Sequence, residues 1–551
     1  MKKTCSMGAR IIALVMGSAA LYACGSDDDN TAPPPVAAAP KSCGDLVSYQ
    51  VKAVNTVITA AEQIDASEAA PWTSPNGGGG SATVTAPFCR IAGSVRPTGS
   101  SDIQFELWLP PADKWNGKFA GTASGGSGGY INYRTVDQHR AMGYASVGHD
   151  NGHRNAEVDF ALNEERKIDF GYRAQHVVTL VGKELTEERY ASAPRYAYYN
   201  GCSQSGHHGV MEMERFPDDY DGIVAGAPAS DWTGTLAAEA NAALAQWATP
   251  GAGIARPLLA AVQRRILQAC DGKPGIDHLV DGVLDDPRRC DFDPAAMQCG
   301  APGADPGECL TVPQVQALRT AYDGRLKSTG ERVALGYTVD ATGGSFFPTD
   351  ATSPDKPQGS WSNHWRYAVL GNPGYDFSTF DWDTDVDHAR QKEGATYDAI
   401  NGNYSAFANS GGKLLMYHGW ADSLITPNLA LQTWERMNGK MGKAEVDSFA
   451  RLFMVPGMDH CGGGAGTSTF ELMTSLAKWV EEGVAPDGTN ELVKAHHGSL
   501  AREQRVDLVQ LNSPALAAMA RFPAPVVVVA HGCVATWWDA AKSEPLAPEF
   551  R

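Results

Sequence analysis

A serine directly beside a cysteine stands in the stretch NGCSQSGHHG, where Ser203 follows Cys202 and glycines lie close on both sides. Two later segments carry possible partners: Asp422 in YHGWADSLITP, and His460 followed by Cys461 in MVPGMDHCGGG. A serine hydroxyl is a weak nucleophile until an imidazole takes its proton, and that imidazole needs a carboxylate to fix its tautomer and stabilise its charged form. These three residues therefore predict a relay for nucleophilic catalysis.

The two cysteines adjoin the proposed nucleophile and the proposed histidine. A disulfide between Cys202 and Cys461 would hold two loops that are distant in sequence at hydrogen-bonding range. By the loop-entropy model, a bridge that closes so long a loop contributes on the order of 5 kcal/mol. We therefore expect this pair to tie serine and imidazole into one covalent unit.

The elements that must position these residues are strands of a parallel sheet covered by helices, because short β-rich apolar runs alternate with segments of helical period. A helix with one buried face is expected at residues 172–191. The expected strands are residues 105–110, 117–122, 144–150, 195–200, 222–227, 413–419 and 451–457. The order serine, acid, histidine at the ends of such strands is that of α/β-hydrolases.

The segment around Ser203 has the layout of a nucleophile elbow, which is a strand, a tight turn with the nucleophile, and a helix. The usual pattern is G-x-S-x-G, and here Ser205 stands where the last glycine is expected. Taken alone, the segment also fits a Gly/Ser-rich surface loop. Asp422 and His460, each just past a later strand, favour the elbow.

The alternation of strands and helices breaks down between residues 230 and 406, which are rich in Gly, Pro, Asp and aromatic residues. We expect residues 230–406 to form a lid inserted into a core of residues 43–229 and 407–551.

The amino-terminal residues indicate export. Basic residues precede a 13-residue apolar run, IIALVMGSAALYA, which is too short to span a bilayer. Residues 1–24 are expected to be a signal peptide with a lipobox that ends at Cys24, where lipid would be attached; an ordinary signal peptide cut nearby is the alternative. Residues 25–42 are acidic and then rich in proline and alanine, so we expect a disordered tether.

The charge and the cysteines limit the partners of the chain. Its net charge of -18 over 551 residues makes nucleic acid an unlikely ligand. An exported chain can form disulfides, and nine of its eleven cysteines remain after those in the signal and the lipobox are set aside. An odd number leaves at least one cysteine without a partner in the chain.

The stretches NGCSQSGHHG, FPDDYDGIVAGAPA, YHGWAD and MDHCGGG resemble the tannase and feruloyl esterase family, which includes mono(2-hydroxyethyl) terephthalate hydrolase. Further segments that resemble family text are WNGKFAGTASGGSGG, GYASVGHDNGH and DFGYRAQHVV. The similarity runs from about Cys43 to about Pro486, and the paired Cys-Ser and His-Cys motif is its most specific part.

The resemblance implies an α/β-hydrolase core with a lid and a serine esterase that acts on esters of aromatic acids through an acyl-enzyme. Ser203 is then the nucleophile, His460 the general base and Asp422 its orienting acid. The oxyanion hole would use the backbone N–H of Gln204 and a second donor from the glycine-rich loop, either Gly125 or Gly126.

The resemblance, together with proximity in the sequence, also predicts four disulfides and leaves Cys533 as the odd cysteine. The expected pairs are Cys43–Cys89, Cys202–Cys461, Cys270–Cys290 and Cys299–Cys309.

A structural calcium ion is implied for the acidic loop between Cys270 and Cys290, far from the nucleophile. Hard cations take six to eight oxygen ligands, and a turn-rich acidic loop can supply them. Three extra residues precede Asp277, and His278 stands where a glycine is usual; a solvated acidic loop is the alternative. The implied ligands are the side chains of Asp271, Asp277 and Asp281 and the carbonyls of Leu279 and Val283.

Specificity is expected in the lid segment GSWSNHWRYAVLGNPGYDFSTFDW, whose aromatic residues could stack on an acyl ring and whose Arg366 could face a carboxylate, although such aromatics more often pack in a core. His207 and His208 are expected to line the pocket or face solvent, and His153 and His418 to be structural or pocket-wall residues. Two other functions stay open: a catalytically silent surface lipoprotein that binds aromatic ligands, and metal-assisted hydrolysis at the acidic loop.

Overall fold

The computed structural model describes residues 39–65, 71–73, 81–84, 86–154, 158–247, 249–277, 279–343 and 360–486, together with three short strand segments at 509–510, 538–539 and 544–545. These described residues, which begin at Ala39, form one compact unit. The predicted signal peptide, the lipidation site Cys24, most of the predicted tether and Cys533 lie outside the described residues.

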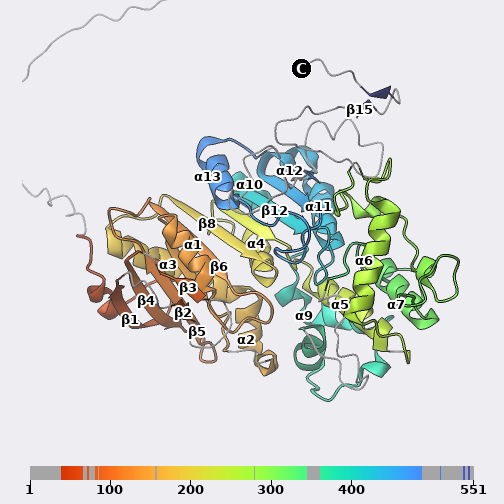
Figure 1. The fold of residues 1–551 in the computed structure, drawn as a ribbon. Coiled ribbons are helices and arrows are strands. Elements are labelled where there is room, and N and C mark those ends of the chain that lie inside the picture. The colour runs from red at the N-terminus through yellow and green to blue at the C-terminus, as the bar shows by residue number, and fades with distance from the viewer. Residues whose placement is uncertain are drawn as a thin grey trace, which may run out of the picture. The chain divides into compact units, whose positions relative to one another are not determined.

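A ten-stranded sheet organises this unit, and its central six strands run parallel (Figure 1). Antiparallel strands extend it at both edges. In spatial order the strands are β1 (Thr56–Ile64), β4 (Phe88–Val95), β5 (Ile103–Leu109), β7 (Ala145–His149), β6 (Lys118–Ala123), β8 (Tyr196–Cys202), β9 (Gly222–Gly226), β12 (Lys413–Gly419), β13 (Ala450–Val455) and β14 (Val509–Gln510).

Side chains alternate along these strands and fill a core on each face of the sheet. In β12, Leu414 and Met416 pack with helices on one face, whereas Leu415 and Tyr417 pack with α13 on the other. The longer helices around the sheet are α1 (Tyr133–Ala141), α3 (Ala174–Tyr190), α4 (Gln204–Arg215), α11 (Asn428–Met441), α12 (Lys443–Phe449) and α13 (Leu472–Glu482); shorter ones are η1 (Gly44–Ser48), η2 (Asp159–Leu162), α2 (Glu164–Ile168) and η3 (Asp169–Arg173).

All seven predicted strands and the predicted helix are present. Six of these strands run parallel as expected, whereas β5 was wrongly expected to be parallel and pairs antiparallel with β4 and β7. β1 and β4 were not predicted. β1 is an edge strand whose residues are half-buried or exposed, so its sequence TVITAAEQI lacks the continuous apolar run of a buried parallel strand.

The chain between β9 and β12, for which we keep the name lid, forms helices around two hydrophobic clusters. One cluster lies entirely within this segment, and the other also includes Phe160, Phe170 and Leu429. Its ends meet where the N–H of Ala399 donates to the carbonyl of Ser230 at 2.7 Å. The predicted limits of the lid, residues 230 and 406, stay predictions. The elements of this segment are α5 (Trp232–Trp247), α6 (Arg256–Cys270), η4 (Pro287–Arg289), η5 (Pro294–Met297), α7 (Val312–Asp323), β10 (Arg325–Leu326), β11 (Arg332–Ala334), α8 (Ser360–Asn363), η6 (His364–Val369), η7 (Phe377–Thr379), α9 (Asp385–Tyr397) and α10 (Ser405–Asn409).

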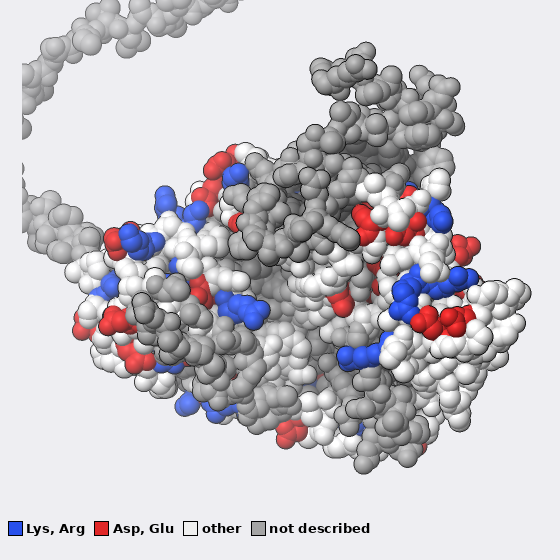
Figure 2. Space-filling view, viewed as in Figure 1, with Lys and Arg blue, Asp and Glu red and all other residues white. Residues whose placement is uncertain are grey.

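Figure 1 shows α5, α6 and α7 of this segment beside one another in yellow-green and green. Two further small hairpins pair β2 (Pro71–Thr73) with β3 (Ser81–Thr83) and β15 (Trp538–Asp539) with β16 (Glu544–Pro545). On the face drawn in Figure 2, acidic and basic side chains of the described residues lie interspersed. Within the described part of the chain, no helix combines the length and the apolar character needed to cross a bilayer.

Candidate active site

Ser203 occupies a sharp turn between β8 and α4. Its backbone has φ 66° and ψ -128°, a combination that residues other than glycine rarely adopt and that is typical of a nucleophile elbow. The Ser203 N–H donates to the carbonyl of Gly226 at the end of β9, 2.9 Å away, which fixes the turn against the neighbouring strand. Because Ser203 directly follows β8, the turn places it at the carboxyl end of this strand.

Ser205, which stands where the elbow pattern has a glycine, is buried, and its hydroxyl forms hydrogen bonds. Its hydroxyl accepts the N–H of Ala123 in β6 at 3.2 Å and lies 2.8 Å from the hydroxyl of Tyr199 in β8. The close backbone contact is made by the next residue, Gly206, where an added Cβ would lie 2.3 Å from the carbonyl oxygen of Gly226. The elbow therefore forms with a serine in this position.

Asp422 and His460 are hydrogen-bonded to each other, as the predicted relay requires. Nδ1 of His460 lies 2.9 Å from Oδ2 of Asp422, whose other oxygen accepts the backbone N–H groups of Leu424 and Ile425 at 2.9 Å each. Asp422 is fully buried in the loop after β12, and His460 lies in the loop after β13. This geometry leaves Nε2 of His460 as the nitrogen that could act as a base; in this structure it lies 3.6 Å from Sγ of Cys461.

His418 is a second partner of the acid. Its Nε2 lies 3.0 Å from Oδ2 of Asp422 and 3.0 Å from the carbonyl oxygen of Ile425. Two acceptors around one nitrogen require that this nitrogen carry the proton, so His418 donates toward Asp422. His418 was expected to be a structural or pocket-wall residue. The structure gives it a structural role, because it holds the carboxylate of Asp422.

The carboxylate of Asp422 and the imidazolium of His460 stabilise each other's charged forms. Burial would raise the pKa of Asp422, but the charge of His460 and hydrogen bonds from His418 and His460 lower it well below its usual range. Burial would likewise lower the pKa of His460, but the charge and hydrogen bond of Asp422, with smaller contributions from Asp459 and Glu239, raise it above 6.5. An ionised acid is therefore paired with an imidazole of increased basicity.

A disulfide joins the serine turn to the histidine loop. Cys202 and Cys461 are bonded, with Cα atoms 5.9 Å apart across a sequence separation of 259 residues. In the described structure Ser203 Oγ makes no hydrogen bond to His460; such contacts are often long in hydrolases without substrate. The other three disulfides are also the expected pairs, Cys43–Cys89, Cys270–Cys290 and Cys299–Cys309.

The three nominated oxyanion donors differ in what surrounds them. The N–H of Gln204 lies in the first turn of α4, where backbone N–H groups lack helical acceptors. The N–H of Gly125, by contrast, already donates to the hydroxyl of Tyr130 at 3.2 Å. Gly126 is exposed, with φ +60° and open space around the position of a Cβ.

Glu239 of α5 is a site residue that the sequence reasoning missed. It is partly buried, whereas the other residues of Trp232–Ala243 are buried, and it interacts electrostatically with His460 and Asp422. Burial raises its pKa to about 8, against the opposing charge of His460 and a hydrogen bond from the backbone of Trp361, while Asp422 adds to the rise. The sequence feature that could have identified Glu239 is a single carboxylate in the alanine-rich run LAAEANAAL.

The acidic loop of the lid packs against the histidine loop. A Cβ added at Gly457, three residues before His460, would lie 2.9 Å from Cγ1 of Val283. Within the loop, carboxylate oxygens of Asp271, Asp277 and Asp281 all lie within 4.8 Å of one another, which suits a hard cation. The extra residues before Asp277 therefore do not remove Asp271 from the cluster, and the loop adjoins the candidate catalytic histidine.

The structure corrects the expected exposure of two histidines and shows what the aromatic and basic residues of the lid segment contact. His207 and His208 do not face solvent: both are fully buried in α4, and Nε2 of His207 bonds the carbonyl of Tyr397 at 2.7 Å. Trp361 and Trp365 lie in the hydrophobic core of the lid, which is the packing alternative. The guanidinium of Arg366 lies over the ring of Phe377, 5.0 Å from its centroid.

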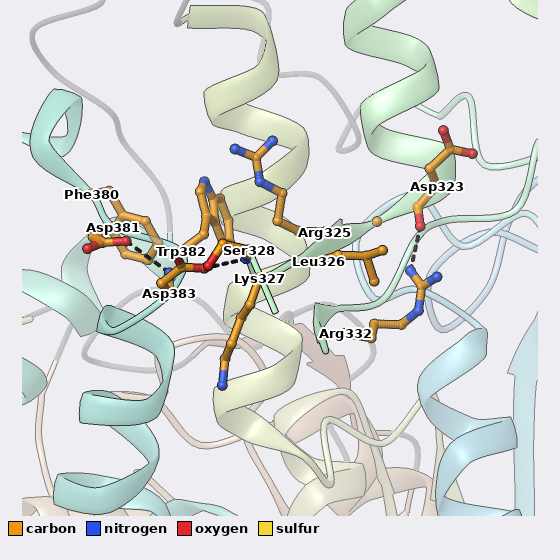
Figure 3. Close-up of a pocket in the computed structure, with 11 residues that line it drawn as sticks. Asp323, Arg325, Leu326, Lys327, Ser328, Arg332, Phe380, Asp381, Trp382 and Asp383 are labelled. Atoms are coloured by element: carbon orange, nitrogen blue, oxygen red, sulfur yellow. Dashed lines mark hydrogen bonds between the residues drawn. The ribbon is translucent and has the colours of Figure 1, made fainter. Parts of the chain in front are cut away.

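A pocket of about 820 Å³ lies on the lid, away from the relay (Figure 3). It is bounded by the β10–β11 hairpin and by residues 380–383, and Arg325 lies over the ring of Trp382 at 5.2 Å. The lining includes none of Ser203, Asp422 and His460. The convergence of these three residues, rather than this pocket, defines the candidate active site.

Comparison with known proteins agrees with the fold. The family model for tannase and feruloyl esterase matches residues 89–515. The chain belongs to the tannase and feruloyl esterase family. It is therefore a carboxylic ester hydrolase with an α/β-hydrolase fold.

Relatives cover most of the chain. An uncharacterized esterase of Xanthomonas campestris pv. campestris is 32% identical over 496 residues, which are 82% of this chain and 84% of that protein. A probable feruloyl esterase B-1 of Aspergillus oryzae is 33% identical over 437 residues, 74% of this chain and 77% of that protein. The crystal structure of feruloyl esterase B from Aspergillus oryzae matches with a TM-score of 0.73 and 29% identity, covering 81% of this chain and 91% of that one.

Proposed function

We propose that the protein hydrolyses esters of aromatic acids through an acyl-enzyme formed on Ser203. The observation that carries the proposal is the covalent link between the strained serine turn and a loop whose histidine is paired with a buried aspartate. A binding protein needs a cavity, but it has no use for a strained serine linked to an oriented imidazole.

In the first half-reaction, Ser203 Oγ bonds to the carbonyl carbon and its proton passes to Nε2 of His460. The electron pair of the carbonyl moves onto its oxygen, where the N–H of Gln204 at the start of α4 is the first hydrogen-bond donor. When the pair returns, the bond to the alkoxy oxygen breaks and that oxygen takes the proton from His460. Water then repeats the sequence and releases the acid.

Asp422 and His418 are positioning residues in this scheme. Asp422 holds the proton of His460 on Nδ1 and stabilises the imidazolium that forms during each half-reaction. His418 and two backbone N–H groups hold Asp422 in turn, so that the carboxylate does not rotate away as the charge on the imidazole changes.

The aromatic acyl group is supported by the family and by the named activity of the feruloyl esterase relatives. Hydrolysis of methyl gallate, methyl ferulate, methyl 4-hydroxybenzoate and terephthalate monoesters would identify the preferred ring. An enzyme that cleaves simple aliphatic esters as fast as all four would contradict an aromatic acyl pocket.

A serine-directed phosphonate tests the mechanism. The expected result is a single adduct on Ser203 by mass spectrometry, absent from the Ser203→Ala variant. A folded wild-type protein that takes no label would instead favour a catalytically silent protein that binds aromatic ligands, and hydrolysis that survives Ser203→Ala would favour metal-assisted hydrolysis at the acidic loop.

We also propose that calcium binds the acidic loop, held by the carboxylates of Asp271, Asp277 and Asp281 and the carbonyls of Leu279 and Val283. The convergence of three carboxylates supports this assignment. Bound calcium would neutralise their mutual repulsion and crosslink the loop.

Export with a lipid on Cys24 is a further proposal, drawn from the amino-terminal sequence. Metabolic labelling with a fatty acid that is lost in Cys24→Ala would support it. Labelling of both proteins, or of neither, would contradict it.

A further inference from the structure

Asp459 links the loop of the acid to the loop of the base. Its Oδ1 accepts three hydrogen bonds: from the N–H and the hydroxyl of Ser423, at 3.0 Å each, and from the N–H of His460 at 2.8 Å. Ser423 directly follows Asp422, and Asp459 directly precedes His460. One carboxylate oxygen therefore binds the backbone of the base and the backbone of the residue after the acid.

The two loops start side by side, because β12 and β13 are neighbouring parallel strands. Backbone bonds continue past the strands: the N–H of Trp420 donates to the carbonyl of Val455 at 2.8 Å, and the N–H of Ala421 donates to the carbonyl of Met458 at 3.0 Å. Further along the loops, the side chain of Asp459 continues this link. Its carboxylate therefore extends the pairing of the two strands as far as the relay.

The lid covers the link between Ser423 and Asp459. Ser423 is buried, and a buried hydroxyl needs a hydrogen-bond partner, which Asp459 supplies. A Cβ added at Gly343 of the lid would lie 2.5 Å from Oγ of Ser423 and 2.7 Å from Oδ2 of Asp459, so the lid leaves no room for a larger side chain there. Shielding from water strengthens hydrogen bonds to a charged oxygen.

Asp459 also places a second negative charge beside the imidazole. Burial alone would lower the pKa of His460, but Asp422, and to a smaller extent the charges of Asp459 and Glu239, raise it above 6.5. Asp422 bonds the ring of His460, whereas Asp459 bonds its backbone N–H. The charge of Asp459 can therefore be removed while the hydrogen bond between the ring and Asp422 remains.

We propose that Asp459 is a positioning residue of the esterase: its carboxylate fixes the loops that carry Asp422 and His460 relative to each other, and its charge stabilises the imidazolium formed in each half-reaction. This role rests on the proposed serine mechanism. A carboxylate that only capped its own loop would bond the N–H of His460 alone, whereas two of the three bonds of Asp459 reach Ser423 on the other loop.

Asp459→Asn and Asp459→Ala separate the link from the charge. The amide oxygen of Asn can accept the same hydrogen bonds without a charge, whereas Ala provides neither. On methyl ferulate, Asp459→Asn should lower kcat several-fold and move the acidic limb of kcat/KM to lower pH, because His460 loses a charge that raises its pKa. Asp459→Ala should show the same shift and a fall in kcat of at least roughly tenfold, with KM changed less than about twofold in both variants.

Two further variants complete the comparison. Ser423→Ala removes one bond of the link but keeps the charge, so kcat should fall several-fold while the acidic limb stays at the pH of the wild type; this holds even if Asp459→Ala does not fold. Asp305→Asn is the matched control, because Asp305 is an exposed lid aspartate that accepts the N–H of Gly307 at 2.8 Å. It should match the wild type in both kcat and the acidic limb.

Three results would overturn the inference: wild-type kcat in Asp459→Ala, an acidic limb of Asp459→Asn at the pH of the wild type, or a rise in KM without a fall in kcat. Each of them leaves the proposed function intact when phosphonate labels Ser203 of the wild type. A folded wild-type protein that takes no phosphonate label would refute the proposed function itself.

Discussion

Cys202 and Cys461 bond the residue before the candidate nucleophile to the residue after the candidate base. The link closes a loop of 259 residues, whereas the lid disulfide Cys299–Cys309 closes one of only 10. By the loop-entropy model these bridges differ in stabilisation, at about 5 against about 3 kcal/mol. The larger functional difference is that only the first bridge fixes the distance between the two catalytic loops.

We therefore expect Cys202→Ala/Cys461→Ala to lower kcat at least roughly tenfold, because small misplacements of catalytic groups are costly. Cys299→Ala/Cys309→Ala is the control, and it should lower the melting temperature with kcat nearly unchanged. The measurements are steady-state kinetics and thermal unfolding of both double variants. Equal kcat values in the two variants would show that the first bridge acts on stability alone.

The pH dependence should report the pairing of His460 with Asp422. The base must be neutral, so kcat/KM falls as the pH drops through the pKa of His460, which its partners raise above 6.5. Asp422→Asn removes the charge that supports the imidazolium while burial remains, so the acidic limb should move below pH 6.5 and kcat should fall by roughly 10³- to 10⁴-fold. In His418→Leu, which keeps Asp422, we expect a loss of roughly tenfold and a limb that stays above pH 6.5. An acidic limb at the same pH in the wild type and Asp422→Asn would assign the titration to another group.

The parallel strands were predictable because both of their faces are covered. Runs such as GIVAGA and KLLMYHG have continuous apolar centres, and each has a glycine at or near its end. The relay followed from them, since Ser203, Asp422 and His460 stand at the ends of such strands. β1 was not predicted, because an antiparallel edge strand buries little of its surface.

The contacts that refine the site were not predictable, because they join residues through the tertiary fold. Glu239 on α5 interacts electrostatically with His460, and Tyr130 bonds Gly125 across a turn with three positive-φ glycines. Ser205 looked like a defect in the elbow, yet its hydroxyl bonds the backbone of Ala123. Each depends on the packing of segments that local sequence patterns do not relate.

Calcium is expected to stabilise the lid loop. Asp277→Asn should weaken calcium binding measured by calorimetry and should abolish the rise in melting temperature that calcium produces in the chelator-treated wild type. Calcium at 100 times its Kd is worth about 2.7 kcal/mol of folding stability. The control is Asp293→Asn, an exposed lid aspartate that pairs with Arg319 outside the loop. Equal calcium affinity in Asp277→Asn and the wild type would exclude the proposed ligand set.

The contact between Val283 and Gly457 should carry the effect of this loop to the active site. Val283→Ala keeps the backbone carbonyl proposed as a calcium ligand but removes the methyl groups that pack against the start of the histidine loop. We expect calcium affinity within about twofold of the wild type and a several-fold lower kcat. The control is Val280→Ala, since that side chain is 84% exposed. A fall in calcium affinity that accounts for all the lost activity would reduce the role of Val283 to metal binding.

Glu239 should make stability depend on pH in the direction opposite to that of a paired carboxylate. Its pKa is raised to about 8 in the folded protein, whereas an unfolded glutamate titrates near 4.5. Below the unfolded value both states are protonated and the residue costs nothing; as the pH rises from about 4.5 to about 8, the unfolded state is favoured. Glu239→Gln removes this cost, so its melting temperature should match that of the wild type near pH 4.5 and exceed it at pH 8. The variant should gain this stability while losing activity, because a carboxyl group kept beside the relay at such a cost is expected to serve the reaction. A constant difference in melting temperature at all pH values would show that the carboxyl group does not titrate as described.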